Sequence, residues 1–207
     1  MKAEQITKKT YQKIAPEFAQ RHFNSKFWLP EYRIFKKLIK GKKVLDVGCG
    51  PGRDAKFFVK NKFDYLGVDY SPAMIRVAKR RVPKGKFKVM DMTRLRFPEK
   101  SFDGFWAAAS LLHIPKSKTS VVLKSFWKIL KPGGIGFVSL KAKENFHTGL
   151  TKLGGFKGLK RYFTYYNNNE LKKLLRRTGF RILKFYSRRN NLGSDKIMWI
   201  CIFVERI

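Results

Sequence analysis

Acidic side chains are scarce in this sequence. Its 207 residues include 47 lysines and arginines but 14 aspartates and glutamates, a formal net charge of +33. Residues 1–43 carry 12 basic and 3 acidic side chains, residues 141–196 carry 15 and 3, and the longer middle, 44–140, carries 19 and 7. So basic a chain attracts polyanions, which makes nucleic acid the first partner to consider. The alternative is a compositional bias that leaves a solvated surface, because charge alone has no specificity.

Cysteines are few and long apolar runs are missing. Cys49 lies in a glycine-rich segment and Cys201 in an apolar run, so we expect neither a disulfide framework nor a metal site, and a reducing, cytoplasmic compartment. No apolar stretch reaches the ~18 residues of a membrane span, and residues 1–18 lack the apolar core of a signal peptide. With 43% hydrophobic residues, the chain is long enough to form a single, monomeric domain with a full core.

The middle of the chain alternates short apolar runs with helical patterns, which is typical of βαβ units and a parallel sheet. We expect strands at 43–47, 65–68, 87–90, 102–108 and 135–140, and helices over 52–61, from 71 onward and over 117–130. Two N-terminal helices, 3–22 and 31–39, should precede the sheet, the first kinked or restarted at Pro16.

After residue 140 the pattern changes. We expect a long loop over 141–166, a helix over 169–178 that ends at Gly179, and two strands at 180–186 and 197–204. The connection between these strands is too short for a parallel crossover, so they should pair antiparallel. The predicted fold is an α/β, Rossmann-like seven-stranded sheet, five parallel strands plus a C-terminal antiparallel hairpin, with helices on both faces.

A glycine-rich segment, Asp46-Val47-Gly48-Cys49-Gly50-Pro51-Gly52, follows the first expected strand directly. Glycines allow a tight turn and a close approach of the backbone to a ligand, and the next helix offers free N–H groups. Asp69 closes the second strand, where an acid can accept hydrogen bonds from both hydroxyls of a ribose. Both features belong to the carboxyl edge of a parallel sheet, where such folds bind ligands.

Five segments in this order, VLDVGCGPG, YLGVDYSPAMI, VMDMTRL, FDGFWAAASLLHI and LKPGGIGFVSL, resemble the motifs of class I S-adenosylmethionine-dependent methyltransferases. The resemblance covers most of the chain. An NAD(P)-binding Rossmann domain is the nearest alternative, but its G-x-G-x-x-G fingerprint needs a third glycine where Arg53 stands. The resemblance implies S-adenosylmethionine as the cofactor and methyl transfer to a nucleophilic nitrogen or oxygen.

The resemblance also implies roles for individual residues toward the methyl donor. Asp46 would hold its ammonium through water, Asp69 its ribose, and Asp91 its adenine amino group. The other donor-binding residues implied are Gly48, Cys49, Gly50 and Gly52 in the loop, Tyr70 and Met74 against the adenine, the Met92 N–H, and Ala107 and Ala108 beyond the fourth strand. Ordinary core packing is the alternative for Tyr70 and Met74.

The N-terminal helix resembles the lid of small-molecule members of the family. Tyr11, Phe18 and Arg21 would close the pocket, with Arg21 or Arg53 near the donor's carboxylate. The implied organisation is one domain over 1–207, with lid helices at 1–42, a donor-binding core at 43–140, a basic aromatic loop at 141–166, and a C-terminal helix and hairpin at 167–207.

His113, after the fourth strand, is the one candidate catalytic side chain. It would act as a general base or acceptor contact, or it would only fix the loop. Methyl transfer from an activated sulfonium needs mainly positioning of the nucleophile. The loop reads Ala-Ala-Ala-Ser, which disfavours the exocyclic-amine nucleic-acid enzymes with (Asp/Asn)-Pro-Pro-(Tyr/Phe), and no Pro-Cys nucleophile is present.

The acceptor is the open question. Arg161, Tyr162, Phe163 and Tyr165 could stack bases and hold phosphates, so one hypothesis is an RNA acceptor, a transfer or ribosomal RNA, bound by the basic flanks. In the alternative, these aromatics anchor the loop on the sheet and the acceptor is a small or lipid-like molecule. A third hypothesis, a protein that binds donor or RNA without turnover, fits poorly with intact donor motifs.

Overall fold

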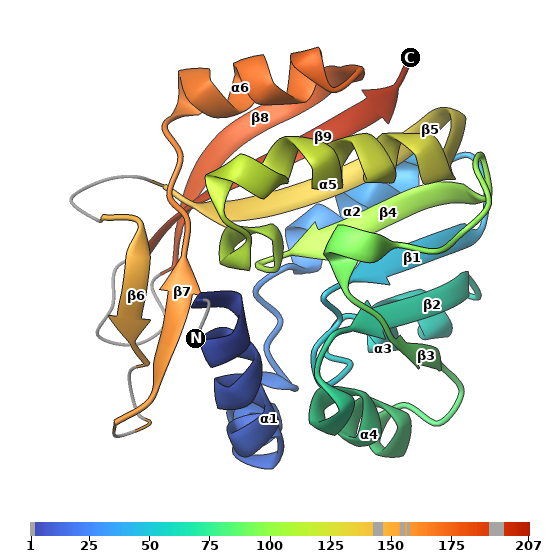
Figure 1. The fold of residues 1–207 in the computed structure, drawn as a ribbon. Coiled ribbons are helices and arrows are strands. Elements are labelled where there is room, and N and C mark those ends of the chain that lie inside the picture. Colours follow the sequence, from blue (N-terminus) through green and yellow to red (C-terminus); the bar gives the residue numbers. More distant parts are fainter. Residues whose placement is uncertain (1–2, 143–146, 154–155, 157, 191–196) are drawn as a thin grey trace.

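The computed structural model describes residues 3–142, 147–153, 156, 158–190 and 197–207. Its centre is a seven-stranded sheet in the order β3-β2-β1-β4-β5-β9-β8 (Figure 1). The strands are β1 (Lys43–Val47), β2 (Asp64–Asp69), β3 (Lys86–Val89), β4 (Phe102–Ala108), β5 (Leu130–Lys141), β8 (Phe180–Asn190) and β9 (Ile197–Arg206). Strands β1 to β5 pair in parallel, whereas β9 is antiparallel to both β5 and β8. The predicted fold class is confirmed.

The helices are α1 (Ala3–His22), α2 (Leu29–Leu38), α3 (Ala55–Lys60), α4 (Pro72–Arg81), α5 (Lys116–Ile129) and α6 (Asn168–Arg177), with short 3-10 turns η1 (Met92–Arg94) and η2 (Leu111–His113). Neighbouring residues of β4 show why the central strands are apolar on both sides. Trp106 packs against Phe35 of α2 and Phe58 of α3, whereas Phe105 packs against Phe126 of α5. Because side chains alternate along a strand, the sheet is covered on both faces.

Outside the sheet, the structure contradicts the expected long loop at 141–166 and a restart of the first helix at Pro16. The expected loop at 141–166 contains a hairpin of β6 (Gly149–Lys152) and β7 (Lys160–Phe163), and residues 143–146, 154–155 and 157 of that loop lie outside the described part. The hairpin lies beside α1 (Figure 1), and β7 contacts this helix. Contacts with a distant helix leave no periodic pattern in the sequence of the hairpin. The first helix does not restart at Pro16, because the flanking Ala15 and Ala19 pack on α4 and hold the helix together.

Within the described ranges, no helix is long and apolar enough to cross a membrane. The same ranges hold no group of three histidine, cysteine, aspartate or glutamate side chains arranged for a metal ion.

Candidate functional site

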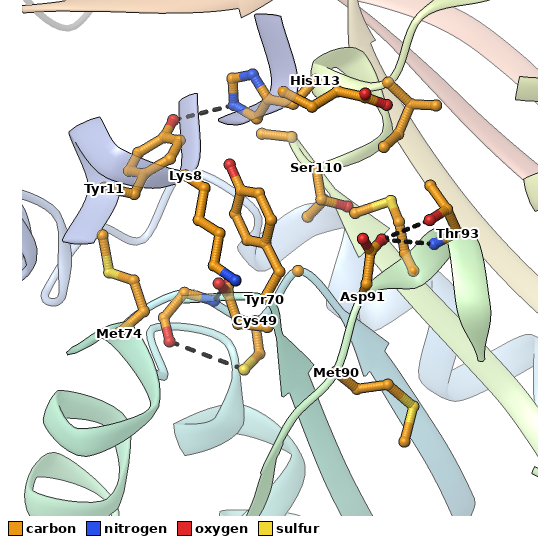
Figure 2. Close-up of a pocket in the computed structure, with 18 of the residues that line it drawn as sticks. Lys8, Tyr11, Cys49, Tyr70, Met74, Met90, Asp91, Thr93, Ser110 and His113 are labelled. Carbon is orange, nitrogen blue, oxygen red and sulfur yellow. Dashed lines mark hydrogen bonds between the residues drawn. The ribbon is translucent and has the colours of Figure 1, made fainter. Parts of the chain in front are cut away.

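A cavity of about 500 Å³ lies at the carboxyl ends of β1 to β4, where residues of α1 line its other side (Figure 2). Parallel pairing of β1 to β4 brings the loops that follow these strands to one edge, as the sequence predicts for a parallel sheet. The predicted site residues that line the cavity are Tyr11, Gly48, Cys49, Gly50, Asp69, Tyr70, Met74, Asp91, Met92, Ala108 and His113. Phe18 and Arg53 line it as well.

Four predicted site residues do not line the cavity. Asp46 is buried and accepts a hydrogen bond from the Tyr65 hydroxyl at 2.8 Å, and Ala107 is enclosed in the core. Gly52 packs closely on Ala78 of α4, so its small size serves helix packing. Arg21 pairs with Glu17 at 2.6 Å on an exposed part of α1.

The electrostatics of Asp46 also differ from the expectation. Burial and the negative charge of Asp54 raise the pKa of Asp46 well above its ordinary range, which favours its neutral form. A neutral, enclosed carboxyl is poorly suited to hold an ammonium group.

Gly48 needs to be glycine. Its φ is +76°, and a Cβ there would lie 2.3 Å from the Cβ of Ser110. The N–H groups of Gly48 and Cys49 donate to the Val68 carbonyl at 2.8 and 3.0 Å, which fixes the loop against β2. At Gly50, φ +52°, the missing Cβ would face open space. The loop therefore presents bare backbone to the cavity.

Asp69 is held by the backbone. Its two oxygens accept from the N–H groups of Gly50 and Ser71 at 3.0 and 2.8 Å. Burial raises the pKa of Asp69 to about 6, although these hydrogen bonds and the charge of Lys8 oppose the rise. Asp91 similarly accepts from the N–H and hydroxyl of Thr93, both at 2.8 Å (Figure 2).

Sequence reasoning missed Asp54, which connects three elements. It accepts hydrogen bonds from the Arg53 guanidinium, from the Tyr32 hydroxyl of α2 and from the indole of Trp106 on β4 at 3.0 Å. Burial opposes its ionisation, but the charge and hydrogen bonds of Arg53 outweigh burial and lower the pKa of Asp54. Asp54 thus fixes Arg53 at the cavity wall. An acid next to the one arginine of the glycine-rich loop is the signal that could have revealed it.

His113 belongs to a network that fastens α1 to the hairpin. Its Nδ1 donates to the Tyr162 carbonyl at 2.7 Å, so its Nε2 accepts from the Tyr11 hydroxyl at 3.0 Å (Figure 2). Arg161 donates to the same Tyr11 oxygen at 2.8 Å. Burial, followed by the charge of Arg161, lowers the pKa of His113 to about 3. This geometry supports the loop-fixing role and disfavours a general base.

The aromatic run ahead of α6 is largely inaccessible. Phe163 and Tyr165 are each 2% exposed and belong to the main core. Tyr162 uses its backbone N–H to bind Thr7 of α1 at 2.8 Å, and the Arg161 guanidinium lies over Phe163. The prediction that Phe163 and Tyr165 stack bases is wrong for this structure, because packing on the sheet buries both rings.

The cavity fits S-adenosylmethionine in two respects, and two further groups on its wall indicate that it takes a ligand. Gly50 leaves room for a ligand against its backbone. Asp69 and Asp91 present carboxylates from neighbouring strand ends, at the places the resemblance assigns to ribose and adenine. The buried hydroxyls of Tyr70 and Ser110, both on the wall, have no hydrogen-bond partner within the described protein. Buried polar groups are almost always satisfied, which indicates a ligand.

Comparison with known proteins agrees with this geometry. Residues 44–134 match the family model described as a methyltransferase domain. A 2-methyl-6-phytyl-1,4-hydroquinone methyltransferase of Synechocystis is 32% identical over 126 residues, 59% of this chain and 39% of that protein. Phosphoethanolamine N-methyltransferase 1 of Arabidopsis thaliana is 38% identical over 105 residues, 48% of this chain and 21% of that protein. The chain thus spans less than half the length of these two relatives.

A solved structure extends the likeness to nearly the whole fold. The 1,6-didemethyltoxoflavin-N1-methyltransferase of Burkholderia thailandensis, crystallised with 1,6-didemethyltoxoflavin and S-adenosylhomocysteine, has a TM-score of 0.77 at 19% identity. The match covers 97% of this chain and 87% of that one, and at this identity it concerns the fold. Residues 44–134 thus match a methyltransferase domain, and the order of the seven strands agrees with a class I methyltransferase fold.

Proposed function

We propose that this protein transfers the methyl group of S-adenosylmethionine to a nucleophilic nitrogen or oxygen of a small-molecule acceptor. The observation that carries the proposal is the cavity of about 500 Å³ between the donor loops and α1. Small-molecule sites are of this size, roughly 300–1,000 Å³. The names of the two curated relatives, a hydroquinone and a phosphoethanolamine methyltransferase, support an acceptor of that kind.

When bound, S-adenosylmethionine supplies a methyl group activated on a sulfonium. The protein's part is to bind and orient. In this proposal Asp69 accepts from the ribose hydroxyls, Asp91 accepts from the adenine amino group, and Arg53, held by Asp54, meets the donor's carboxylate. Helix α1 covers the reacting groups and excludes water, so most of the rate enhancement comes from proximity and alignment.

Donor binding is the first test. Calorimetry should show S-adenosylmethionine and its demethylated product binding in the micromolar range, about 8 kcal/mol. Asp69→Ala should weaken both at least ~10-fold, because hydrogen bonds to a charged group are worth ~1.5–3 kcal/mol. Equal affinity in this variant would contradict the ribose role, and tighter binding of NAD than of the donor would reject the proposal.

Acceptor class is the second test. Tritiated methyl transfer into separated metabolites, RNA and protein should label the metabolite fraction. RNA is the second candidate, supported by the net charge of +33. If RNA is the acceptor, log affinity falls linearly with log salt by ~0.7–0.9 per neutralised phosphate. Tritium in the RNA fraction with none in the metabolite fraction would identify RNA as the acceptor.

A further inference from the structure

The wall of the cavity carries four basic side chains and several hydroxyl groups besides its carboxylates. Lys8 of α1, Arg94 of η1 and Lys118 of α5 line it in addition to Arg53. The Lys8 ammonium lies 5.9 Å from the centre of the Tyr70 ring, and Figure 2 shows the two side chains side by side, close to Tyr11. The Tyr70 and Ser110 hydroxyls are the buried, unpartnered groups described above.

The carboxylates on the wall are all engaged. Glu4 accepts two hydrogen bonds from Lys118 at 3.0 Å. Asp69 is bound by two backbone N–H groups, and Asp91 by the N–H and hydroxyl of Thr93. In the proposed function the last two also receive the donor's ribose and adenine. Hydrogen bonds from these groups stabilise the ionised carboxylates, which makes them weaker proton acceptors.

The other titratable side chains on the wall are no better as bases. The Nε2 of His113 is occupied by the Tyr11 hydroxyl. Burial, then the charges of Arg53, Arg161 and Arg21, lowers the pKa of His22, so those three guanidinium groups would repel any proton placed on its ring. Burial raises the pKa of the Cys49 thiol well above its ordinary value, which keeps the thiol protonated.

We propose that the acceptor is an acidic hydroxyl compound, a small phenol, enol or carboxylic acid, which binds and reacts as its oxyanion against Lys8 and the hydroxyls of Tyr70 and Ser110. This inference rests on the methyl transfer proposed above. The acceptor's oxygen lone pair forms the bond to the methyl carbon, while the carbon–sulfur bond breaks and its electron pair stays on sulfur. No proton moves in this step, and the negative oxygen and positive sulfonium neutralise each other.

Positive charge on the cavity wall favours the acceptor oxyanion in two ways. Cations near a bound hydroxyl lower its pKa and hold its anion. An enclosed site of low dielectric strengthens that attraction, because less water screens it. Lys8 and the other basic residues on the cavity wall thus have a use that does not require nucleic acid.

The test is a pH series of kcat/KM with phenols of graded acidity, 4-nitrophenol, 4-cyanophenol and phenol, at saturating S-adenosylmethionine. The rising limb of each profile should follow the ionisation of the phenol itself and shift from one phenol to the next. One midpoint shared by all three phenols would reveal a base on the protein and overturn the proposal. Methylation of amines with no methylation of phenols, enols or carboxylates would overturn it too, while leaving methyl transfer intact.

Variants test the assigned contacts. Lys8→Met should lower kcat/KM for the phenolates by roughly 10-fold, the effect of one lost charge-assisted hydrogen bond. Lys13→Met, on an exposed part of the same helix, is the matched control and should react like the parent. Ser110→Ala and Tyr70→Phe should raise the acceptor KM without changing the donor Kd measured by calorimetry.

Different results would reject the acceptor contact and the methyl transfer itself. Weaker donor binding in Ser110→Ala and Tyr70→Phe, with unchanged acceptor KM, would assign these hydroxyls to the donor and overturn the acceptor contact. Failure of the parent to bind S-adenosylmethionine would instead reject the proposed function itself.

Discussion

The floor and the roof of the cavity are built in opposite ways. The floor, the donor loops after β1, β2 and β3, is fixed by backbone groups of residues close to the loop, such as the Gly50 N–H on Asp69. The roof, α1, is fixed by bonds to partners 150 and 155 residues away, Thr10 to the Lys160 carbonyl at 2.6 Å and Tyr162 N–H to Thr7 at 2.8 Å. We therefore expect a substitution that changes the backbone of the donor loops to be strongly destabilising. Because α1 is held by several separate contacts, it should stay folded when one of them is removed.

The largest effect should come from breaking the floor. Gly48→Ala places a Cβ 2.3 Å from that of Ser110 at a φ of +76°. We expect the free energy of unfolding to fall by about 3 kcal/mol, from left-handed backbone strain and overpacking together. Gly50→Ala, where a Cβ meets nothing within 4 Å, should cost only about 1 kcal/mol while still weakening donor binding. Urea denaturation measures both, and equal costs would contradict the assigned contact.

The next largest effect is the pH dependence of donor affinity, which Asp69 of the floor should control. Because the pKa of Asp69 is raised to about 6, the free protein protonates it below that pH, and a neutral carboxyl loses the charge that attracts the ribose hydroxyls. Donor affinity should therefore fall below pH 6, by up to about tenfold per pH unit. Asp69→Asn should remove this dependence. Calorimetry between pH 5 and pH 8 tests it, and an unchanged slope in the variant would assign the proton elsewhere.

The same residue has the opposite effect on stability. A folded-state pKa above the ordinary 3.8 means that the native protein binds this proton more readily than the unfolded chain. Asp69 alone should thus lower the free energy of unfolding as pH rises from about 4 to about 6, the window in which donor affinity rises.

A smaller effect should follow from loosening the roof. Tyr11→Phe removes the oxygen shared by His113 and Arg161, for a loss of about 1 kcal/mol in the free energy of unfolding. Acceptor KM should rise several-fold while the donor Kd stays the same. Tyr162→Phe is the control, since Tyr162 contributes backbone groups to this network. A change in donor Kd in Tyr11→Phe would show that roof and floor are not independent.

The smallest effect concerns the outer end of the roof. Lys118 pairs with Glu4 at 3.0 Å, and its side chain is 48% exposed. Such ion pairs contribute little, so Lys118→Met should change the free energy of unfolding by less than about 0.5 kcal/mol. Faster amide hydrogen exchange in the first turns of α1 would be its visible consequence. Lys128→Met, which removes an ion pair far from α1, should leave that exchange unaltered.

The sequence by itself determined the fold and the floor. Buried strands and turn residues identified β1 to β5 with boundaries within a few residues, and β1 and β4 at their observed ends. Motifs placed Gly48, Gly50, Asp69 and Asp91 at one edge because the ends of parallel strands always meet there. Such features depend on residues near one another in the chain, so a local pattern carries them.

Only the tertiary structure decided the roof and the electrostatics. The β6–β7 hairpin exists because α1 packs beside it, and its own residues show no period. Asp46 and Asp54 are both aspartates near the glycine-rich segment, yet burial and the charge of Asp54 raise the pKa of Asp46, whereas the charge and hydrogen bonds of Arg53 lower the pKa of Asp54. Among the three roles left open for His113, the loop-fixing one is favoured because Tyr11, 102 residues earlier, binds its Nε2. Distant contacts of this kind depend on how whole elements pack, and no spacing along the chain encodes them.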